Sequence, residues 1–116
     1  MLPNGLPRRL RLHLRTDFET IIQAGHKVQN SGLTLWCQVR PKGPARFAVV
    51  VSKKLGPAVV RNRTKRVLRE AFRTLQVRLK AGADIIVKPR QSEKLSTVQA
   101  AQDALTSLCG KAALLK

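Results

Sequence analysis

The sequence predicts a small α/β (α+β) fold, a two-layer sandwich in which helices cover a small sheet. Residues 56–80 repeat apolar and basic side chains with helical period, which predicts one long amphipathic helix. Residues 33–40 alternate apolar and polar side chains, and residues 46–52 and 84–88 are apolar runs, so these three segments are predicted strands. With a short helix at each end, the predicted order is helix, strands, long helix, strand, helix.

With 116 residues, the chain is long enough for one domain whose core needs no metal or disulfide. Hydrophobic residues make up 43% of the sequence, close to the globular average, which argues against general disorder. We expect a flexible basic arm over residues 1–15, including Arg9 and Arg11, although a merely solubilising tail explains the same residues. Residues 16–116 are expected to form the single domain.

Both short helices carry signals at their ends. Thr16 and Glu19 have the spacing of a capping box, which predicts Thr16 as the N-cap of a first helix that stops before Gly25. Ser96 and Gln99 have the same spacing, which predicts Ser96 as the N-cap of the last helix.

Trp36 is the unusual residue of the strand at 33–40. The strand alternation places it with the polar side chains, whereas a core Trp is expected among the apolar ones. The ring is therefore either covered by the first helix or offered to a ligand. Our hypothesis is that it does some of both, lining a cleft between the sheet and that helix.

The long helix carries a cationic ridge opposite its apolar face. At about 100° per residue, the apolar face and the ridge fall on opposite sides of the helix. The apolar face contains Val60, Thr64, Val67, Leu68, Ala71, Phe72, Leu75 and Leu79. The ridge contains Asn62, Lys65, Arg66, Arg69 and Arg73, with Arg61 and Arg63 flanking it.

A basic helix face is often only a solvated surface, but two features of this ridge point to a phosphate ligand. Glu70 is the one acidic residue that interrupts it, so i,i+4 pairs within the helix cannot neutralise it. The densest part, residues 61–66, lies in the first turns, where the helix dipole already favours anions. A cationic cluster there destabilises the helix until an anion binds.

The overall charge points to a polyanionic partner. Lys and Arg number 23 against six Asp and Glu, which gives a formal net charge of +17. Nucleic acid is the first candidate and an anionic membrane surface is the second. No apolar run approaches the roughly 18 residues of a membrane span, and no secretory signal is apparent, so we expect a cytoplasmic protein that does not bind membranes.

The residues contain no recognisable catalytic or metal site. The six acidic residues are scattered along the chain, and neither His13 nor His26 has a carboxylate or Cys close by in the sequence. Cys37 and Cys109 are far apart and fit reduced, buried thiols better than a disulfide or a zinc site. We therefore expect a binding protein with no catalytic residue and no metal of its own.

Three consecutive motifs surround the start of the long helix. They are Val50-Val51-Ser52-Lys53-Lys54-Leu55-Gly56, then Val60-Arg61-Asn62-Arg63-Thr64-Lys65-Arg66, then Arg69-Glu70-Ala71-Phe72. Together they resemble the protein subunit of bacterial ribonuclease P. The order and spacing are specific, and the likeness extends from about Arg8 to Leu108. It implies a mostly antiparallel four-stranded sheet, the order αβββαβα, and a ribosomal protein S5 domain 2-like fold. It also implies a left-handed βαβ crossover, where general rules favour a right-handed one.

The resemblance also implies a function. In this family the RNA subunit carries the active site and most of the magnesium, while the protein binds that RNA and the 5′ leader of precursor tRNA, with no need for DNA or for an oligomer. By position, the RNA-binding residues are Arg61, Asn62, Arg63, Lys65, Arg66, Arg69 and Arg73 on the helix, Lys53 and Lys54 at the strand end, and Arg9 and Arg11 in the arm. The leader cleft is assigned Phe18, Ile22, Trp36 and Arg40.

Two positions depart from the family pattern, and rival functions stay open. Ile22 stands where many relatives carry a second aromatic residue, and Trp36 where Tyr is common, so leader stacking is expected to depend more on one ring. A ribosomal or ribosome-assembly protein shares this charge and size. A DNA-binding module is a further alternative, but a ridge of Arg and Lys contacts phosphates more than bases.

Overall fold

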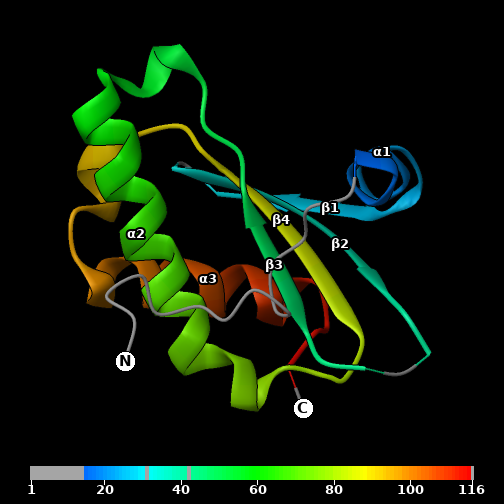
Figure 1. Cartoon of the computed structure of the whole chain (residues 1–116). Coiled ribbons are helices and arrows are strands. Elements are labelled where there is room, and N and C mark those ends of the chain that lie inside the picture. The colour runs from blue at the N-terminus through cyan, green and yellow to red at the C-terminus, as the bar shows by residue number, and fades with distance from the viewer. Residues whose placement is uncertain (1–14, 31, 42, 116) are drawn as a thin grey trace.

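The computed structural model describes residues 15–30, 32–41 and 43–115, and these residues form a sheet with helices on both faces (Figure 1). The predicted order αβββαβα is observed within this part of the chain. Three short 3₁₀ turns lie at Lys53–Leu55, Gln76–Arg78 and Ser92–Leu95. The main elements are α1 (Arg15–Ala24), β1 (His26–Gln29), β2 (Leu33–Val39), β3 (Arg46–Val49), α2 (Ala58–Leu75), β4 (Ala83–Pro89) and α3 (Val98–Lys111).

The sheet has the strand order β1-β2-β4-β3. β1 pairs with β2 and β2 with β4 in antiparallel fashion, whereas β3 and β4 are parallel, so the expected mostly antiparallel sheet is confirmed. The β3–α2–β4 segment is the predicted βαβ unit. The left hand of its crossover and the likeness to ribosomal protein S5 domain 2 stay predictions.

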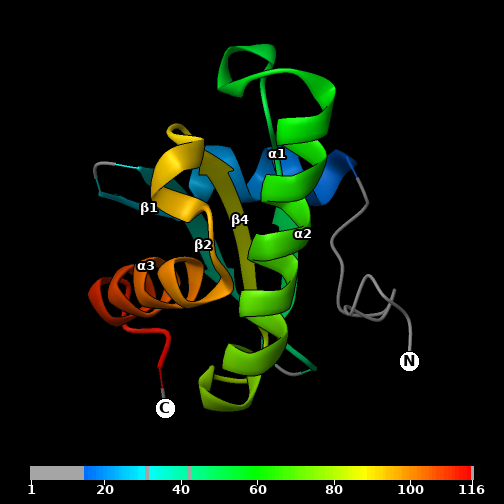
Figure 2. The same ribbon diagram turned by 90° about the vertical axis from the view of Figure 1, so that its left-hand side faces the viewer.

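The main core lies between the sheet and α2 with α3, and α1 covers part of the opposite face (Figures 1 and 2). Phe72 of α2 stacks on Phe47 of β3 with ring centroids 4.4 Å apart. On the other face, Ile21 of α1 packs with Ala48 and Ile86 in a smaller cluster. Among the described residues, no helix combines the length and apolar character that crossing a membrane requires.

Both capping-box predictions are wrong. α1 begins at Arg15, so Thr16 lies inside the helix instead of preceding it. At α3 the N-cap is Thr97, whose side chain accepts a hydrogen bond from the Ala100 N–H at 3.1 Å. Ser96 has right-handed helical backbone angles because it ends the preceding 3₁₀ turn, so it cannot supply the extended N-cap.

The ends of two elements also differ from the sequence prediction, and one strand was not located from the sequence. α2 ends at Leu75, and the chain continues as a 3₁₀ turn where one helix to residue 80 was expected. β3 stops at Val49 and not at residue 52. β1 was not located from the sequence, because its four residues are short of apolar side chains and mostly exposed.

A buried carboxylate joins the strands at one corner of the sheet. Asp84 of β4 is 3% exposed and accepts hydrogen bonds from Arg46 at 2.8 and 2.9 Å and from Arg40 Nε at 3.0 Å. The Arg40 guanidinium also donates to the Pro44 carbonyl at 2.6 Å. Gly82 closes the corner with φ +80°, where an added Cβ would lie 2.2 Å from the Arg40 carbonyl oxygen.

The two cysteines are buried free thiols, as expected. Burial raises the pKa of the Cys37 thiol. Burial, and to a lesser extent Cys37, raises the pKa of Cys109 to about 12. Both side chains therefore act as small core residues and not as nucleophiles.

We predict that Asp84→Ala destabilises the fold by about 3 kcal/mol, the lower end of the range for breaking a buried ion pair, because both arginines are partly exposed. Urea unfolding measures the change. The matched control is Asp103→Asn on α3, an exposed carboxylate whose one hydrogen-bond partner among the described residues is Gln99. This control is expected to change stability by less than about 0.5 kcal/mol. A similar loss in both variants would contradict the role of Asp84.

Candidate nucleic-acid interface

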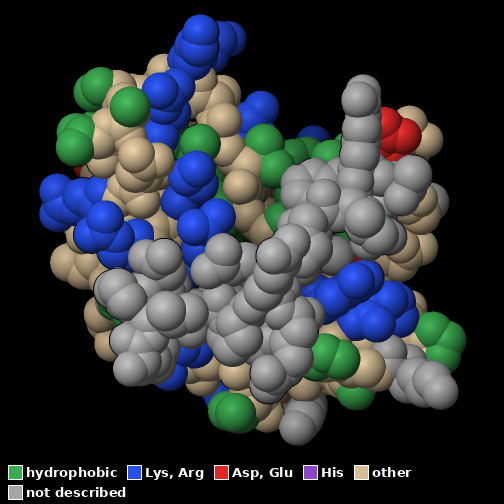
Figure 3. Space-filling model, viewed as in Figure 1, with side chains coloured by type: hydrophobic (Ala, Val, Ile, Leu, Met, Phe, Trp, Pro, Cys, Tyr) green, Lys and Arg blue, Asp and Glu red, His purple; other side chains and the backbone are tan. Residues whose placement is uncertain are grey.

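α2 carries the predicted ridge on the face that it turns away from the sheet. Its apolar face is buried through Thr64, Leu68, Ala71, Phe72 and Leu75, so the opposite arc faces outward. Lys and Arg side chains gather along the α2 side of the molecule (Figure 3). The ridge is made of exposed Asn62, Arg63 and Arg66 with half-buried Arg61, Lys65, Arg69 and Arg73.

The first turn of α2 holds no anionic group. Its N-cap is Pro57, which supplies no side-chain hydrogen bond, and no acidic residue lies in the first turn. The positive end of the helix dipole therefore adds to the positive side chains that follow. Further along, a hollow of about 240 Å³ is lined by Asn62, Lys65, Arg66 and Arg69. Its lining offers donors and positive charge, which suits a phosphate group.

One member of the ridge is partly neutralised. Arg73 Nε donates to both carboxylate oxygens of Glu70, at 3.1 and 3.2 Å, and its Nη2 donates to one of them as well. The hydrogen bond from Arg73, supported by its charge, lowers the pKa of Glu70. The sequence expectation concerned i,i+4 pairs, and this i,i+3 pair offsets part of the ridge instead. It sets Arg73 apart from the arginines of the first turns.

On the opposite face of the sheet, Trp36 contacts α1 through Ile21 and also lines a hollow, whose named lining residues come from strands and turns and not from α1. That a ligand binds there stays a prediction. The half-buried indole packs against the cluster of Ile21, Ala48 and Ile86. It also lines a hollow of about 470 Å³, called here the Trp36 hollow. The hollow is lined by Lys27, Gln29, Thr34, Trp36, Ser52, Lys54, Leu55, Lys88, Pro89 and Arg90. Four of these side chains are basic and none is acidic, so the hollow joins an aromatic ring to a cationic rim.

Comparison with known proteins identifies the family. The family model described as Ribonuclease P matches residues 6–113. The chain belongs to the ribonuclease P protein family. A relative from Brevibacillus brevis, named ribonuclease P protein component, is 32% identical over 94% of this chain and 87% of its own length. The protein component of Thermotoga petrophila is 39% identical over 78% of this chain and 77% of its own.

Solved structures of the family share the fold. The RNase P protein of Staphylococcus aureus, 32% identical, superposes with a TM-score of 0.80 over 92% of this chain and 98% of its own. The RNase P protein of Thermotoga maritima, also 32% identical, gives a TM-score of 0.77 over 87% and 96%. The expected α/β fold of a ribonuclease P protein is thereby confirmed.

The structure separates the residues assigned to the leader cleft of a ribonuclease P protein. Ile22 is exposed on α1, on the same side of the sheet as Trp36. Arg40 does not line the Trp36 hollow, because it lies beyond the opposite end of β2, bound to Asp84. Phe18 belongs to α1, but its side chain lies outside the described residues, as do Arg9 and Arg11.

Three basic residues of the Trp36 hollow were not predicted from the sequence: Lys27, Lys88 and Arg90. Strand pairing brings two of them there, since Lys27 is the cross-strand partner of Trp36 and Lys88 that of Thr34. These two lysines can be assigned to the hollow only when the strand register is known. Of the two strand-end lysines, Lys54 lines the hollow and Lys53 is exposed in the same turn.

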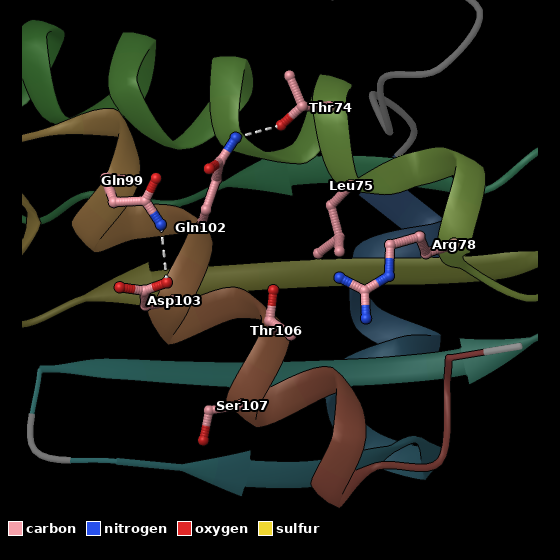
Figure 4. A pocket seen from close by; sticks show the side chains of 8 residues that line it. All are labelled: Thr74, Leu75, Arg78, Gln99, Gln102, Asp103, Thr106 and Ser107. Atoms are coloured by element: carbon pink, nitrogen blue, oxygen red, sulfur yellow. Dashed lines mark hydrogen bonds between the residues drawn. The ribbon is translucent and has the colours of Figure 1, made fainter.

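A second hollow, of about 510 Å³, lies between α2 and α3 (Figure 4). Its polar groups largely satisfy one another. The Gln102 amide donates to Thr74 at 2.5 Å and the Gln99 amide to Asp103 at 3.0 Å. The lining holds one basic residue, Arg78, and one acidic residue, Asp103, so this hollow lacks the positive surplus that a phosphate ligand requires.

The side chains that most often bind metals are spread apart in the described part of the chain. No group of three or more His, Cys, Asp or Glu side chains comes together there. Asp84, the buried carboxylate, is already bonded to two arginines. That the protein alone holds no metal stays a prediction.

We predict that Glu70→Gln strengthens the dependence of RNA affinity on salt. The change frees Arg73 from its partner, and one added phosphate contact steepens the log–log salt slope by roughly 0.7 to 0.9. Filter binding of a structured RNA over a salt series measures the slope. Asp103→Asn removes the same charge from α3, and an equal steepening there would show that only net charge matters.

Proposed function

We propose that this protein is the protein subunit of ribonuclease P and assists the endonucleolytic 5′ maturation of tRNA. It binds the catalytic RNA through the ridge of α2 and the 5′ leader of precursor tRNA through the face of the sheet that carries Trp36. The observation that carries the proposal is the ridge itself, a row of exposed and half-buried basic residues that begins at a helix end without a side-chain cap, in a chain of this family.

The ridge acts on the RNA mainly through phosphates. Arg61, Arg63 and Arg66 have no carboxylate partner among the described residues, so their donors are available to RNA oxygens. The rest of the proposed RNA-binding set is Asn62, Lys65, Arg69 and Arg73 on the helix, Lys53 and Lys54 in the turn before it, and Arg9 and Arg11 in the arm. Such a surface binds folded RNA tightly at low salt and distinguishes base sequence poorly.

The proposal assigns catalysis to the partner RNA and binding to the protein. Cleavage of a phosphodiester needs groups that activate water and stabilise charge, which magnesium ions supply in many nucleases. In our proposal the partner RNA holds most of these ions and the active site. The protein offsets the repulsion between two RNA molecules and holds the leader in place. The same proposal includes no membrane or DNA partner, does not require an oligomer, and places the protein in the cytoplasm.

Reconstitution tests the function. The protein alone is expected to leave precursor tRNA intact in magnesium, whereas adding a bacterial ribonuclease P RNA is expected to give cleavage at the 5′ end of the mature tRNA, at lower magnesium than the RNA needs by itself. Gel analysis of labelled precursor measures both. Cleavage by protein that has been treated to remove RNA would overturn the ribonucleoprotein model.

The same preparation distinguishes the rival function. A ribosomal or ribosome-assembly protein is expected to co-purify with ribosomal particles and to leave the magnesium requirement of ribonuclease P RNA unchanged. One discrete structured RNA in the purified complex, identified by sequencing, supports the ribonuclease P subunit instead.

We predict that Trp36→Leu weakens binding of precursor tRNA by the reconstituted complex about 5- to 150-fold, the cost of losing a ring on which a base stacks. Leu keeps apolar contact with Ile21 and Ile86, so the fold is expected to persist. Mature tRNA has no leader, and its binding is expected to stay nearly constant. Equal losses for both ligands would show that Trp36 is only structural, while Trp36→Tyr should restore most of the precursor affinity.

A further inference from the structure

Lys27 lies directly over the ring that we assign to stacking. It belongs to β1, and the antiparallel register places it opposite Trp36. Its ammonium nitrogen is 5.7 Å from the centre of the indole ring. Lys27 makes no hydrogen bond or ion pair with another described residue, so the ring is its one specific partner in that part of the chain.

The surroundings explain why the ammonium lies on the ring. Lys54, Lys88 and Arg90 also line the Trp36 hollow, and no Asp or Glu does. Without a carboxylate to pair with, the negative face of an indole is the best partner that Lys27 can reach. Trp36 also packs against the cluster of Ile21, Ala48 and Ile86, so part of its surface is already covered. A base that stacks on the indole therefore competes with the ammonium for the part that remains open.

A base and the ammonium compete unequally for the ring. The contact between a cation and an exposed aromatic ring changes an equilibrium constant by about two- to fivefold. A base stacked on such a ring contributes about 5- to 150-fold. The base therefore displaces the ammonium, and a displaced ammonium in a hollow of like charges is drawn to the phosphate that arrives with the base.

We propose that Lys27 is a specificity residue of the Trp36 hollow. When a nucleotide base stacks on Trp36, the Lys27 ammonium leaves the indole ring and binds a backbone phosphate of the same ligand. This inference rests on the proposed function and adds to it one RNA-binding residue and a preference between charged and uncharged ligands. The exchange favours a base that carries an anionic backbone and disfavours an uncharged aromatic ligand, for which the ammonium is only a competitor.

Trp36 is the only Trp of the chain, so its fluorescence reports on the hollow directly. The experiment titrates the full chain with a short single-stranded RNA and with an oligonucleotide of the same bases on an uncharged methylphosphonate backbone. Lys27→Met removes the charge and keeps the length of the side chain. Lys27→Arg tests rescue, and Lys111→Met, at the end of α3, is the matched loss of one charge outside the hollow.

Lys27→Met is expected to shift the two ligands in opposite directions. RNA should bind about two- to fivefold more weakly, with a salt slope shallower by roughly 0.7, because one phosphate contact is lost. The uncharged oligonucleotide should bind about two- to fivefold more tightly, because the competitor for the ring is gone. Lys27→Arg should restore the wild-type order, and Lys111→Met should leave the uncharged ligand unaffected.

Two results would overturn the inference and are distinguishable. If both oligonucleotides change Trp36 fluorescence but the uncharged one binds the Lys27→Met variant no more tightly, then the exchange is wrong and the hollow still binds RNA. If neither oligonucleotide changes Trp36 fluorescence in the wild-type protein, then the leader assignment in the proposed function is wrong and the exchange with it.

Discussion

The packing of α2 on the sheet is the interaction on which the rest of the structure depends. Phe72 stacks on Phe47 at the centre of this contact, and Leu68, Ala71 and Leu75 extend it along the helix. Because a helix has one period, burying this face fixes which side chains point outward. The position of the ridge is therefore a consequence of hydrophobic burial.

The charge of the protein opposes its own folding. With a formal net charge of +17, the positive side chains repel one another. The positive end of the helix dipole, at the first turn of α2, adds to this repulsion. Within the described residues, the carboxylates relieve this locally: Asp84 at the sheet corner and Glu70 beside Arg73. The Trp36 hollow receives no such relief, and Lys27 there uses an aromatic ring in place of a carboxylate. Surfaces that keep uncompensated charge are those that the proposed RNA partners would neutralise.

The two candidate surfaces differ in how far the sequence could predict them. The ridge lies on a single helix, so its residues follow from the spacing of residues 58–75 alone. The Trp36 hollow is assembled from β1, β2, β4 and the turn after β3, which are far apart in the sequence. Arg40 illustrates the difference, since the alternation correctly placed it on the same face as Trp36. Strand pairing, however, places Arg40 beside Asp84, at the end of β2 away from the Trp36 hollow.

By itself, the sequence determined the fold class, the long helix with its two faces, three of the four strands and the family motifs, because each depends on local periodicity or spacing. The tertiary structure decided which cations surround Trp36, because Lys27 and Lys88 reach it only through strand register. It also decided the N-cap of α3, since Ser96 belongs to the end of the preceding 3₁₀ turn and Thr97 is the N-cap. Hydrophobic periodicity acts within one element, whereas register and caps depend on neighbouring elements, and that difference separates what could be predicted from what could not.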